Sequence, residues 1–140
     1  MKSTHKLIIL AVLSLIPFSG CSLTKGKGIA EAAVARFHDQ YNNGRFHEIY
    51  IETDDGFKKV TSESEFTTLL DALRRKLGSV TTATQAGWGV NATPMGTVAT
   101  LHFDVDFSEG KGTEQFVFHI SGNKAMLYNY NVNSPLLLTR

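Results

Sequence analysis

Residues 97–120, TVATLHFDVDFSEGKGTEQFVFHI, decide the fold that the sequence predicts. Apolar and polar side chains alternate along both halves of this stretch, which is typical of strands with one buried face. The dipeptide Gly110-Lys111 separates the halves and fits the loop of a hairpin. We therefore expect two antiparallel strands that share one apolar face and one polar face.

The pairing of these two strands follows from their apolar residues. With a two-residue loop at Gly110-Lys111, Phe103 lies opposite Phe118, and the other inward apolar residues also meet apolar ones. A slip by one residue would bring Asp104 beside a phenylalanine, which disfavours that register. We therefore expect the apolar register.

Strand-like alternation continues on both sides of this hairpin. It runs through residues 80–90 before the hairpin and residues 125–132 after it, and a three-residue loop, 121–123, joins the last two strands. The inner face is expected to carry Val80, Thr82, Thr84, Ala86, Trp88 and Val90 from the first strand, and Met126, Tyr128, Tyr130 and Val132 from the last. The result is a meander of four antiparallel strands.

Helical spacing of apolar residues precedes the sheet. We expect a first helix over residues 29–43 and a second, short one over residues 45–50. Residues 57–60 fit a brief strand, and a third helix follows from Ser62, which forms a capping box with Glu65. Helices that come first and cover one face of a curved antiparallel meander give an α+β fold.

The only cysteine of the chain, Cys21, follows a segment typical of a signal peptide. Two lysines, Lys2 and Lys6, precede the apolar run 7–18, which at about a dozen residues is shorter than the roughly 20 that span a bilayer. The sequence FSGC resembles the bacterial lipobox, in which the cysteine after the cleavage point receives lipid, although Phe18 replaces the usual leucine. The alternative is an uncleaved anchor, or an ordinary signal peptide with an incidental cysteine.

The lipobox interpretation divides the chain into three parts. Residues 1–20 are the signal peptide, residues 21–28 are the lipidated cysteine and its tether, and residues 29–140 are a single α+β domain. Lipid chains on Cys21 would hold the protein on a membrane. Because Ser22 rather than aspartate follows the cysteine, the resemblance implies the inner leaflet of the outer membrane, facing the periplasm.

The charge pattern excludes one class of function. Lysine and arginine together number 14 against 13 acidic residues, and residues 73–76, LRRK, are the only basic cluster. Nucleic-acid binding needs several clustered cations, so we expect no nucleic-acid partner. The sequence also predicts no cofactor and no catalytic residue.

Four phrases of the sequence resemble a known group of proteins: FHEIYIETDDGFKKVTSESEF, LRRKLGSV, HFDVDFSEGKGTEQFVFHI and LYNYNVNS. The group is that of small bacterial lipoproteins of uncharacterised function with a nuclear transport factor two-like, or cystatin-like, fold. The resemblance implies a sheet that curls around the helices into a cone. That superfamily includes ketosteroid isomerase-like enzymes, polyketide cyclase-like enzymes and binding modules.

The inner face of such a cone is where a ligand would bind. It is expected to line a pocket with Trp88, Thr84, Tyr128 and Tyr130. Glu114 lies only near a strand end. His38 and His47 are expected to lie beside the apolar stripes of their helices, at the boundary of the core. An acid–base enzyme needs a carboxylate or histidine close to the proton that it moves, so a buried one here would favour catalysis over binding.

The polar face suggests a metal site. In the expected register His102 lies opposite His119, and Asp104 lies diagonally from His119. Cross-strand neighbours have Cβ atoms about 5 Å apart, close enough for these three side chains and water to bind a metal. The alternative is a solvated polar face on which two histidines merely touch.

The same face also suggests a docking patch. There Val117 is expected beside Leu127, with Ala125 next to His119. An apolar strip on a polar face is either without function or a contact for a partner.

Together these patterns predict a membrane-anchored periplasmic lipoprotein with a non-catalytic binding domain. Its partners would be the membrane, through the lipid on Cys21, an envelope protein, and a second copy bound through the sheet. The alternatives are a small-molecule pocket protein or isomerase-like or cyclase-like enzyme, and a metal-binding lipoprotein.

Overall fold

The computed structural model describes the backbone of residues 20–139 and the side chains from Leu23 onward. The predicted signal peptide up to residue 19 and the side chain of Cys21 lie outside the described residues. In chain order the elements are α1 (Gly20–Asn42), α2 (Phe46–Ile51), α3 (Asp55–Val60), α4 (Glu63–Leu77), β1 (Val80–Thr93), β2 (Gly96–Phe107), β3 (Gly110–Ser121), β4 (Lys124–Asn133) and the short 3-10 helix η1 (Pro135–Leu138).

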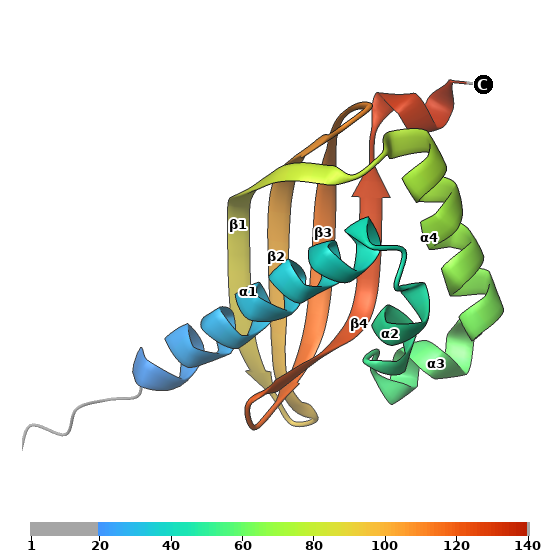
Figure 1. Cartoon of the computed structure of the whole chain (residues 1–140). Helices are drawn as coiled ribbons and strands as arrows, with labels where there is room; N and C mark the ends of the chain where they lie inside the picture. The colour runs from blue at the N-terminus through green and yellow to red at the C-terminus, as the bar shows by residue number, and fades with distance from the viewer. Residues whose placement is uncertain (1–19, 140) are drawn as a thin grey trace, which may run out of the picture.

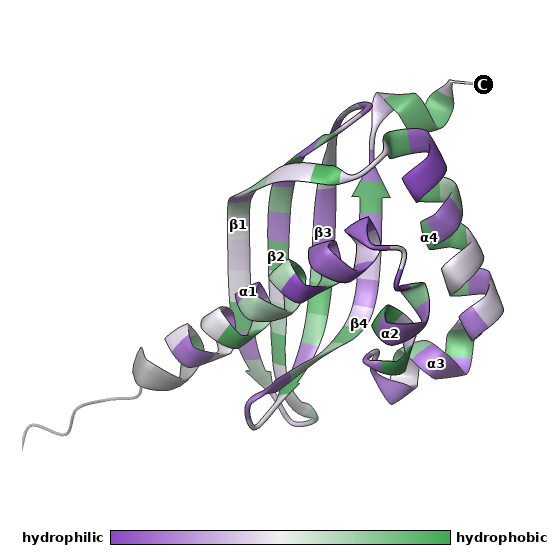
Figure 2. Ribbon diagram, in the orientation of Figure 1, coloured by the Kyte–Doolittle hydropathy of each residue, from purple (hydrophilic) through white to green (hydrophobic). Residues whose placement is uncertain are grey.

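The four strands form one antiparallel sheet in the order β1-β2-β3-β4, which confirms the predicted α+β meander. Helix α1 crosses one face of this sheet, and α2, α3 and α4 gather beside β4 (Figure 1). We call the face that α1 covers the inner face and the opposite one the outer face. Figure 2 shows apolar and polar residues alternating along the strands, as a sheet with one buried face requires.

The core forms where the apolar stripe of α1 meets the inner face. Val34 and Phe37 of α1 are buried, as are Leu101 of β2 and Phe116 of β3. The Phe37 and Phe116 rings meet edge to face with centroids 5.1 Å apart, a favourable arrangement for aromatic pairs. This contact fixes α1 across the middle of the sheet.

Helix α4 begins and ends as its sequence predicts. The Ser62 side chain accepts a hydrogen bond from the Glu65 backbone N–H, and the Glu65 side chain accepts one from the Ser62 backbone N–H. Gly78 ends the helix with a φ of 79°, a conformation that favours glycine.

Two local predictions differ from the structure. Residues 57–60 belong to helix α3 instead of a strand, because the Asp54 side chain accepts a hydrogen bond from the Gly56 N–H at 2.7 Å and so caps a helix. Helix α1 begins at Gly20, so residues 23–28 are helical where a tether before the first helix was expected. This segment packs on β1: Gly26 is buried, and Lys27 Nζ lies 5.4 Å from the centre of the Trp88 ring.

The predicted register of β2 and β3 was wrong. The turn falls at residues 108–109, and Phe103 lies opposite Glu114 in place of Phe118, a shift of four residues. An even shift keeps every side chain on its predicted face, so alternation alone cannot exclude it. The turn is bound to the end of α4, since Glu109 N–H donates to Leu77 O at 3.0 Å and Ser108 N–H donates to Ser79 O at 2.8 Å.

The hairpin of β3 and β4 also differs from the prediction. Its loop has two residues, 122–123, and Phe118 pairs with Leu127 in place of Met126. The next pair along the strands is Val117 with Asn129. A bulge in β4 between these two pairs shifts the register by one residue. A one-residue difference moves side chains to the opposite face, which decides where the predicted site residues lie.

Candidate functional site

The structure separates the four residues predicted to line one pocket. Tyr130 pairs with buried Phe116, and Trp88 pairs with buried Leu101, so both lie on the inner face. Thr84 pairs with exposed Asp104 and therefore lies on the outer face. Two register shifts in β1 cause this difference, one of them between Gln85 and Gly87.

Tyr128, the fourth of these residues, lies on the outer face. The bulge in β4 places its ring on that of His119, with centroids 4.3 Å apart. The predicted inner position of Tyr128 was therefore wrong.

The predicted docking patch does not form. Ala125 and Leu127 are each only 4% exposed and belong to the core, while Val117 is half-buried on the outer face. The two-residue loop of the β3–β4 hairpin turns Ala125 and Leu127 inward. Apolar residues that fill the core offer no surface to a partner.

The geometry required for the predicted metal site is also missing. His102 lies opposite Gln115, and His119 lies four residues further along β3, opposite Val98. His119 Nδ1 instead lies 3.0 Å from Asp54 Oδ2. Within residues 23–139, no group of three histidine, cysteine or acidic side chains is placed to hold a metal ion.

A cluster that the sequence did not reveal lies on the inner face, around Glu114. This residue is 3% exposed and sits in β3 opposite Phe103. Its Oε2 lies 2.6 Å from His38 Nε2, and its Oε1 accepts a hydrogen bond from the Tyr130 hydroxyl at 2.6 Å. We call Glu114, His38 and Tyr130 the inner cluster.

The hydrogen bonds of the inner cluster fix the protons of His38. When the Glu114 carboxylate is ionised it only accepts hydrogen bonds, and the Nε2 atom of His38 that faces it then carries the proton. In the neutral imidazole, Nδ1 is then unprotonated, and among the described residues no hydrogen bond reaches it. His38 can therefore accept a proton at Nδ1 while Glu114 holds its ring.

The carboxylate changes the acidity of two tyrosines. Burial raises the pKa of Tyr130 well above 10, and the nearby Glu114 charge and its hydrogen bond raise it further. Burial likewise raises the pKa of Tyr41, with a second contribution from Glu114. Both hydroxyls therefore stay protonated at physiological pH and act as donors.

His38 also lines an open pocket of about 290 Å³ between α1 and the edge of the sheet. The pocket walls come from α1, β1 and β2 and consist of Glu31, Val34, Ala35, His38, Ala83, Gln85 and Phe103. They are mainly apolar, with a few polar groups that face the same space. Small-molecule sites commonly have this composition, and this volume lies near the lower end of their range.

Gln85 supplies the second polar group of this pocket. Its Nε2 atom is buried and has no hydrogen-bond partner among the described residues. Leaving a buried donor unpaired costs about 1–3 kcal/mol. Rotation of the Gln85 side chain toward the pocket would bring this amide to a ligand oxygen.

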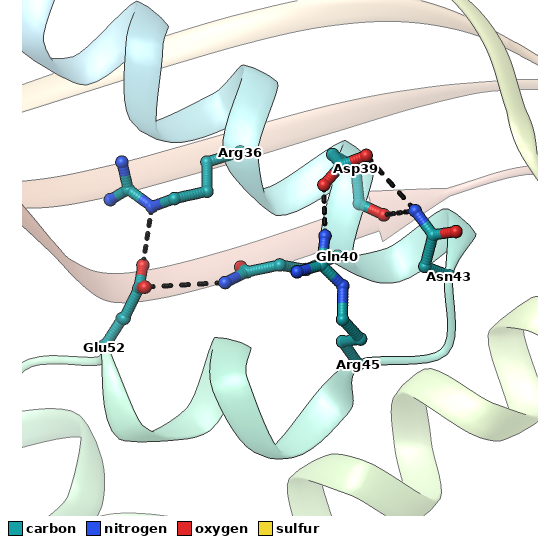
Figure 3. A network of polar contacts seen from close by, with 6 residues as sticks. All are labelled: Arg36, Asp39, Gln40, Asn43, Arg45 and Glu52. Carbon is teal, nitrogen blue, oxygen red and sulfur yellow. Dashed lines mark hydrogen bonds and ion pairs between the residues drawn. The ribbon is translucent and has the colours of Figure 1, made fainter.

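Helix α1 is held in place by polar contacts with the segment that follows it (Figure 3). Arg36 Nε donates to Glu52 Oε2 at 2.7 Å, and Gln40 Nε2 lies 3.4 Å from Glu52 Oε1. Arg45 binds Asp39, the residue next to His38. These contacts fix the rotation of α1 about its axis, which keeps His38 directed at the sheet.

The sequence contains a partial signal for the inner cluster. Glu114 lies two residues before Phe116, so strand alternation places it on the apolar face. His38 directly follows Phe37 of the helix stripe. Only the structure brings these two residues together, because their pairing depends on how α1 crosses the sheet.

The chain matches no known protein-family model and none of the curated proteins with which it was compared. Among the helices of residues 20–139, none is long and apolar enough to cross a membrane. The fold is thus that of an α+β protein with N-terminal helices and a four-stranded meander.

Proposed function

We propose that the chain is a lipid-anchored protein of the cell envelope whose α+β domain binds a small molecule beside His38. The observation that carries the binding proposal is a mainly apolar pocket that is lined by His38 and by Gln85, whose buried amide nitrogen has no partner among the described residues. The anchor rests on the lipobox-like FSGC sequence around Cys21. The nuclear transport factor two-like family remains part of this proposal, supported by helices that cover one face of a meander.

The pocket favours a particular ligand chemistry. Val34, Ala83 and Phe103 provide apolar contacts for a ring or short chain. The Gln85 amide donates a hydrogen bond, so it suits a carbonyl oxygen, and neutral His38 accepts one at Nδ1, so it suits a hydroxyl group. A small apolar molecule that carries such an oxygen fits the site.

The proposal can be tested with simple probes on the full chain in bilayer nanodiscs. The probes are cyclohexanone and phenol, with cyclohexane and benzene as matched rings without oxygen. A ligand that binds only the folded state raises the midpoint of thermal unfolding. We expect the oxygen-bearing rings to raise it more than the hydrocarbons do.

Variants assign this effect to the site. Gln85→Leu should remove the cyclohexanone shift while leaving the unliganded protein equally or more stable, because it removes an unpaired buried amide. His38→Gln should remove the phenol shift. Gln115→Leu, on the outer face opposite His102, is the control and should change neither. If Gln85→Leu retains the full cyclohexanone shift, the ligand does not bind in this pocket.

One observation favours a second candidate function, acid–base catalysis. A histidine that lines a pocket and is held at Nε2 by a buried carboxylate is suited to remove a proton from a substrate with its other nitrogen. His38 Nδ1 would take a proton from the carbon next to a carbonyl, and the resulting negative charge on oxygen would accept a hydrogen bond from Gln85. The same proton, or a deuteron exchanged from solvent, would then return to that carbon.

Exchange of these carbon-bound protons measures the second candidate. In D₂O, cyclohexanone should lose its α-proton NMR signals faster with the wild-type protein than with His38→Gln. Equal rates would leave binding as the function of the pocket.

A further inference from the structure

One end of the domain combines an attachment point, positive charge and an exposed apolar tip. It consists of the first turns of α1, the turn of the β1–β2 hairpin (residues 93–96) and the turn of the β3–β4 hairpin (residues 121–124), which we call the α1–hairpin end. Figure 1 shows the start of α1 and both hairpin turns at this end, away from the C-terminus. A Cβ atom added at Gly26 would lie 3.4 Å from Val90 Cγ1, so α1 and β1 are in close contact here.

The positive charge lies between α1 and the β3–β4 hairpin. A groove of about 450 Å³ there is lined by Lys25, Arg36 and Lys124, and by no acidic side chain among the described residues. Arg36 is paired with Glu52, whereas neither lysine has an ion-pair partner within residues 23–139. Two unpaired ammonium groups in one groove attract phosphate.

The apolar tip is Met95, in the turn of the β1–β2 hairpin. Its side chain is 97% exposed, while Leu23 in the first turns of α1 is 43% exposed. Methionine is flexible and apolar, so it enters disordered apolar surroundings at little conformational cost. A tip with this composition suits the boundary between headgroups and acyl chains.

Negative charge is present at this end, but on the other side of the β1–β2 hairpin. Asp54, Asp55 and Lys59 line a separate pocket there, together with Met95. Asp54 is bound to His119 and to the Gly56 N–H. The two aspartates outnumber Lys59 in that pocket, so the net positive charge lies on the α1 side of Met95.

The position of Cys21 directs this end toward a bilayer. Cys21 lies in the first turn of α1, about one helical turn before Lys25. Because the helix already includes Gly20, no flexible linker separates Cys21 from the domain. Lipid on Cys21 would therefore hold the α1–hairpin end against the headgroups.

We propose that the α1–hairpin end is a second membrane contact, in which Lys25 and Lys124 bind the headgroup phosphates of anionic phospholipids and Met95 reaches the acyl boundary. The proposal rests on the lipid anchor that forms part of the proposed function. The domain then stands with the β2–β3 turn and η1 directed away from the membrane. These lie at the far end of the strands, where a Cβ atom added at Gly110 would lie 2.8 Å from Leu136 Cδ1.

Single labels on the lipid-modified full chain test this orientation. Because lipid occupies the only native thiol, Met95→Cys and Leu138→Cys each add one free thiol for a polarity-sensitive dye. Leu138 is a matched control, since it is apolar, 88% exposed and located at the far end in η1. In vesicles of phosphatidylcholine with phosphatidylglycerol, the dye at position 95 should report apolar surroundings and the dye at position 138 should report water.

Charge-removing variants test the two lysines. Each lysine near an anionic surface contributes roughly five-fold to association, so Lys25→Gln with Lys124→Gln should reduce the fraction of buried dye by an order of magnitude or more. Vesicles of phosphatidylcholine alone should give the same loss. Free inorganic phosphate at millimolar concentration should leave the signal of the dye at position 95 unchanged. If phosphate alone returns this dye to aqueous surroundings, the ligand is a soluble anion and the membrane contact is overturned.

Two failures can be separated in one preparation. Mass spectrometry shows whether Cys21 carries lipid, and its absence overturns the anchor and the orientation that depends on it. If Cys21 carries lipid and positions 95 and 138 report the same surroundings, the membrane contact is wrong while the anchor stands.

Discussion

The Tyr130 hydroxyl lies 2.6 Å from Glu114 Oε1 and donates a hydrogen bond to a carboxylate that is almost completely buried. His38 faces the other oxygen of the same carboxylate. A buried charge is stable only when its oxygens are satisfied, so Tyr130 and His38 make this position of Glu114 possible.

Replacing Glu114 by glutamine should destabilise the fold. The glutamine oxygen can accept only one of the two donors well, and the amide group cannot accept the other. Because hydrogen bonds to charged groups contribute about 1.5–3 kcal/mol, we expect the free energy of unfolding in urea to fall by about that amount. Glu109→Gln, at an exposed position in the β2–β3 turn, should change it little. Equal losses in the two variants would show that the inner cluster does not stabilise the protein.

Tyr130→Phe should change how stability depends on alkaline pH. The folded-state pKa of Tyr130 is raised above its ordinary value of 10, so the unfolded chain releases this proton first as pH rises. The stability that depends on the proton is present below pH 10 and is lost as pH rises toward the folded-state pKa. The variant should be less stable than wild type near neutral pH, and its stability should fall less steeply above pH 10. Parallel curves of unfolding free energy against pH would contradict this account.

The cap of α4 allows a separate prediction. Ser62→Ala should lower the free energy of unfolding by about 1 kcal/mol, because it removes the side chain that caps the helix. Hydrogen bonds from Ser62 also lower the pKa of Glu65, so stability from this pair is present above the ordinary glutamate pKa and lost as pH falls through the lowered one. The cost of Ser62→Ala should therefore shrink in acid. Ser64→Ala, inside the same helix, is the control, and an equal cost there would disprove the capping role.

Two glycines with positive φ should respond differently to alanine. Gly78 has a φ of 79°, and an added Cβ would lie 1.8 Å from Ser108 Oγ, a clash on top of the backbone strain. Gly122 has a φ of 59°, with no atom within 4 Å of an added Cβ. Gly122→Ala should cost about 1–2 kcal/mol from strain alone, and Gly78→Ala should cost clearly more. Thermal unfolding of the pair measures this difference, and equal midpoints would mean that the contact between α4 and the β2–β3 turn is loose.

The sequence was sufficient for the fold class but not for strand pairing. Alternation in residues 97–120 and the capping box at Ser62 follow from local chemistry, and the structure confirms the meander and α4. The four-residue shift between β2 and β3 preserves both faces, so it leaves the pattern unchanged. The hydrogen bond from the Glu109 N–H to Leu77 O joins distant parts of the chain and helps to fix the observed register of β2 and β3.

The site was harder to predict than the fold, because bulges decide which residues share a face. The register shifts in β1 and β4 placed Thr84 and Tyr128 on the outer face, and of the two only the β1 shift has a local signal, the glycines at positions 87 and 89. Glu114 was on the predicted face, yet its burial depends on His38 from a helix 76 residues earlier. Long-range pairing of this kind is visible only in three dimensions.

The central claim is that Glu114 holds His38 with Nδ1 free to act in the pocket. The most direct test is nitrogen-15 NMR of the histidine side chains in the full chain, with the His38 signals assigned from the His38→Gln variant. At about pH 9, where histidine is normally neutral, the account predicts a proton on Nε2, an unprotonated Nδ1, and a change at Nδ1 when phenol is added. A proton on Nδ1, or an Nδ1 signal that phenol leaves unchanged, would contradict it.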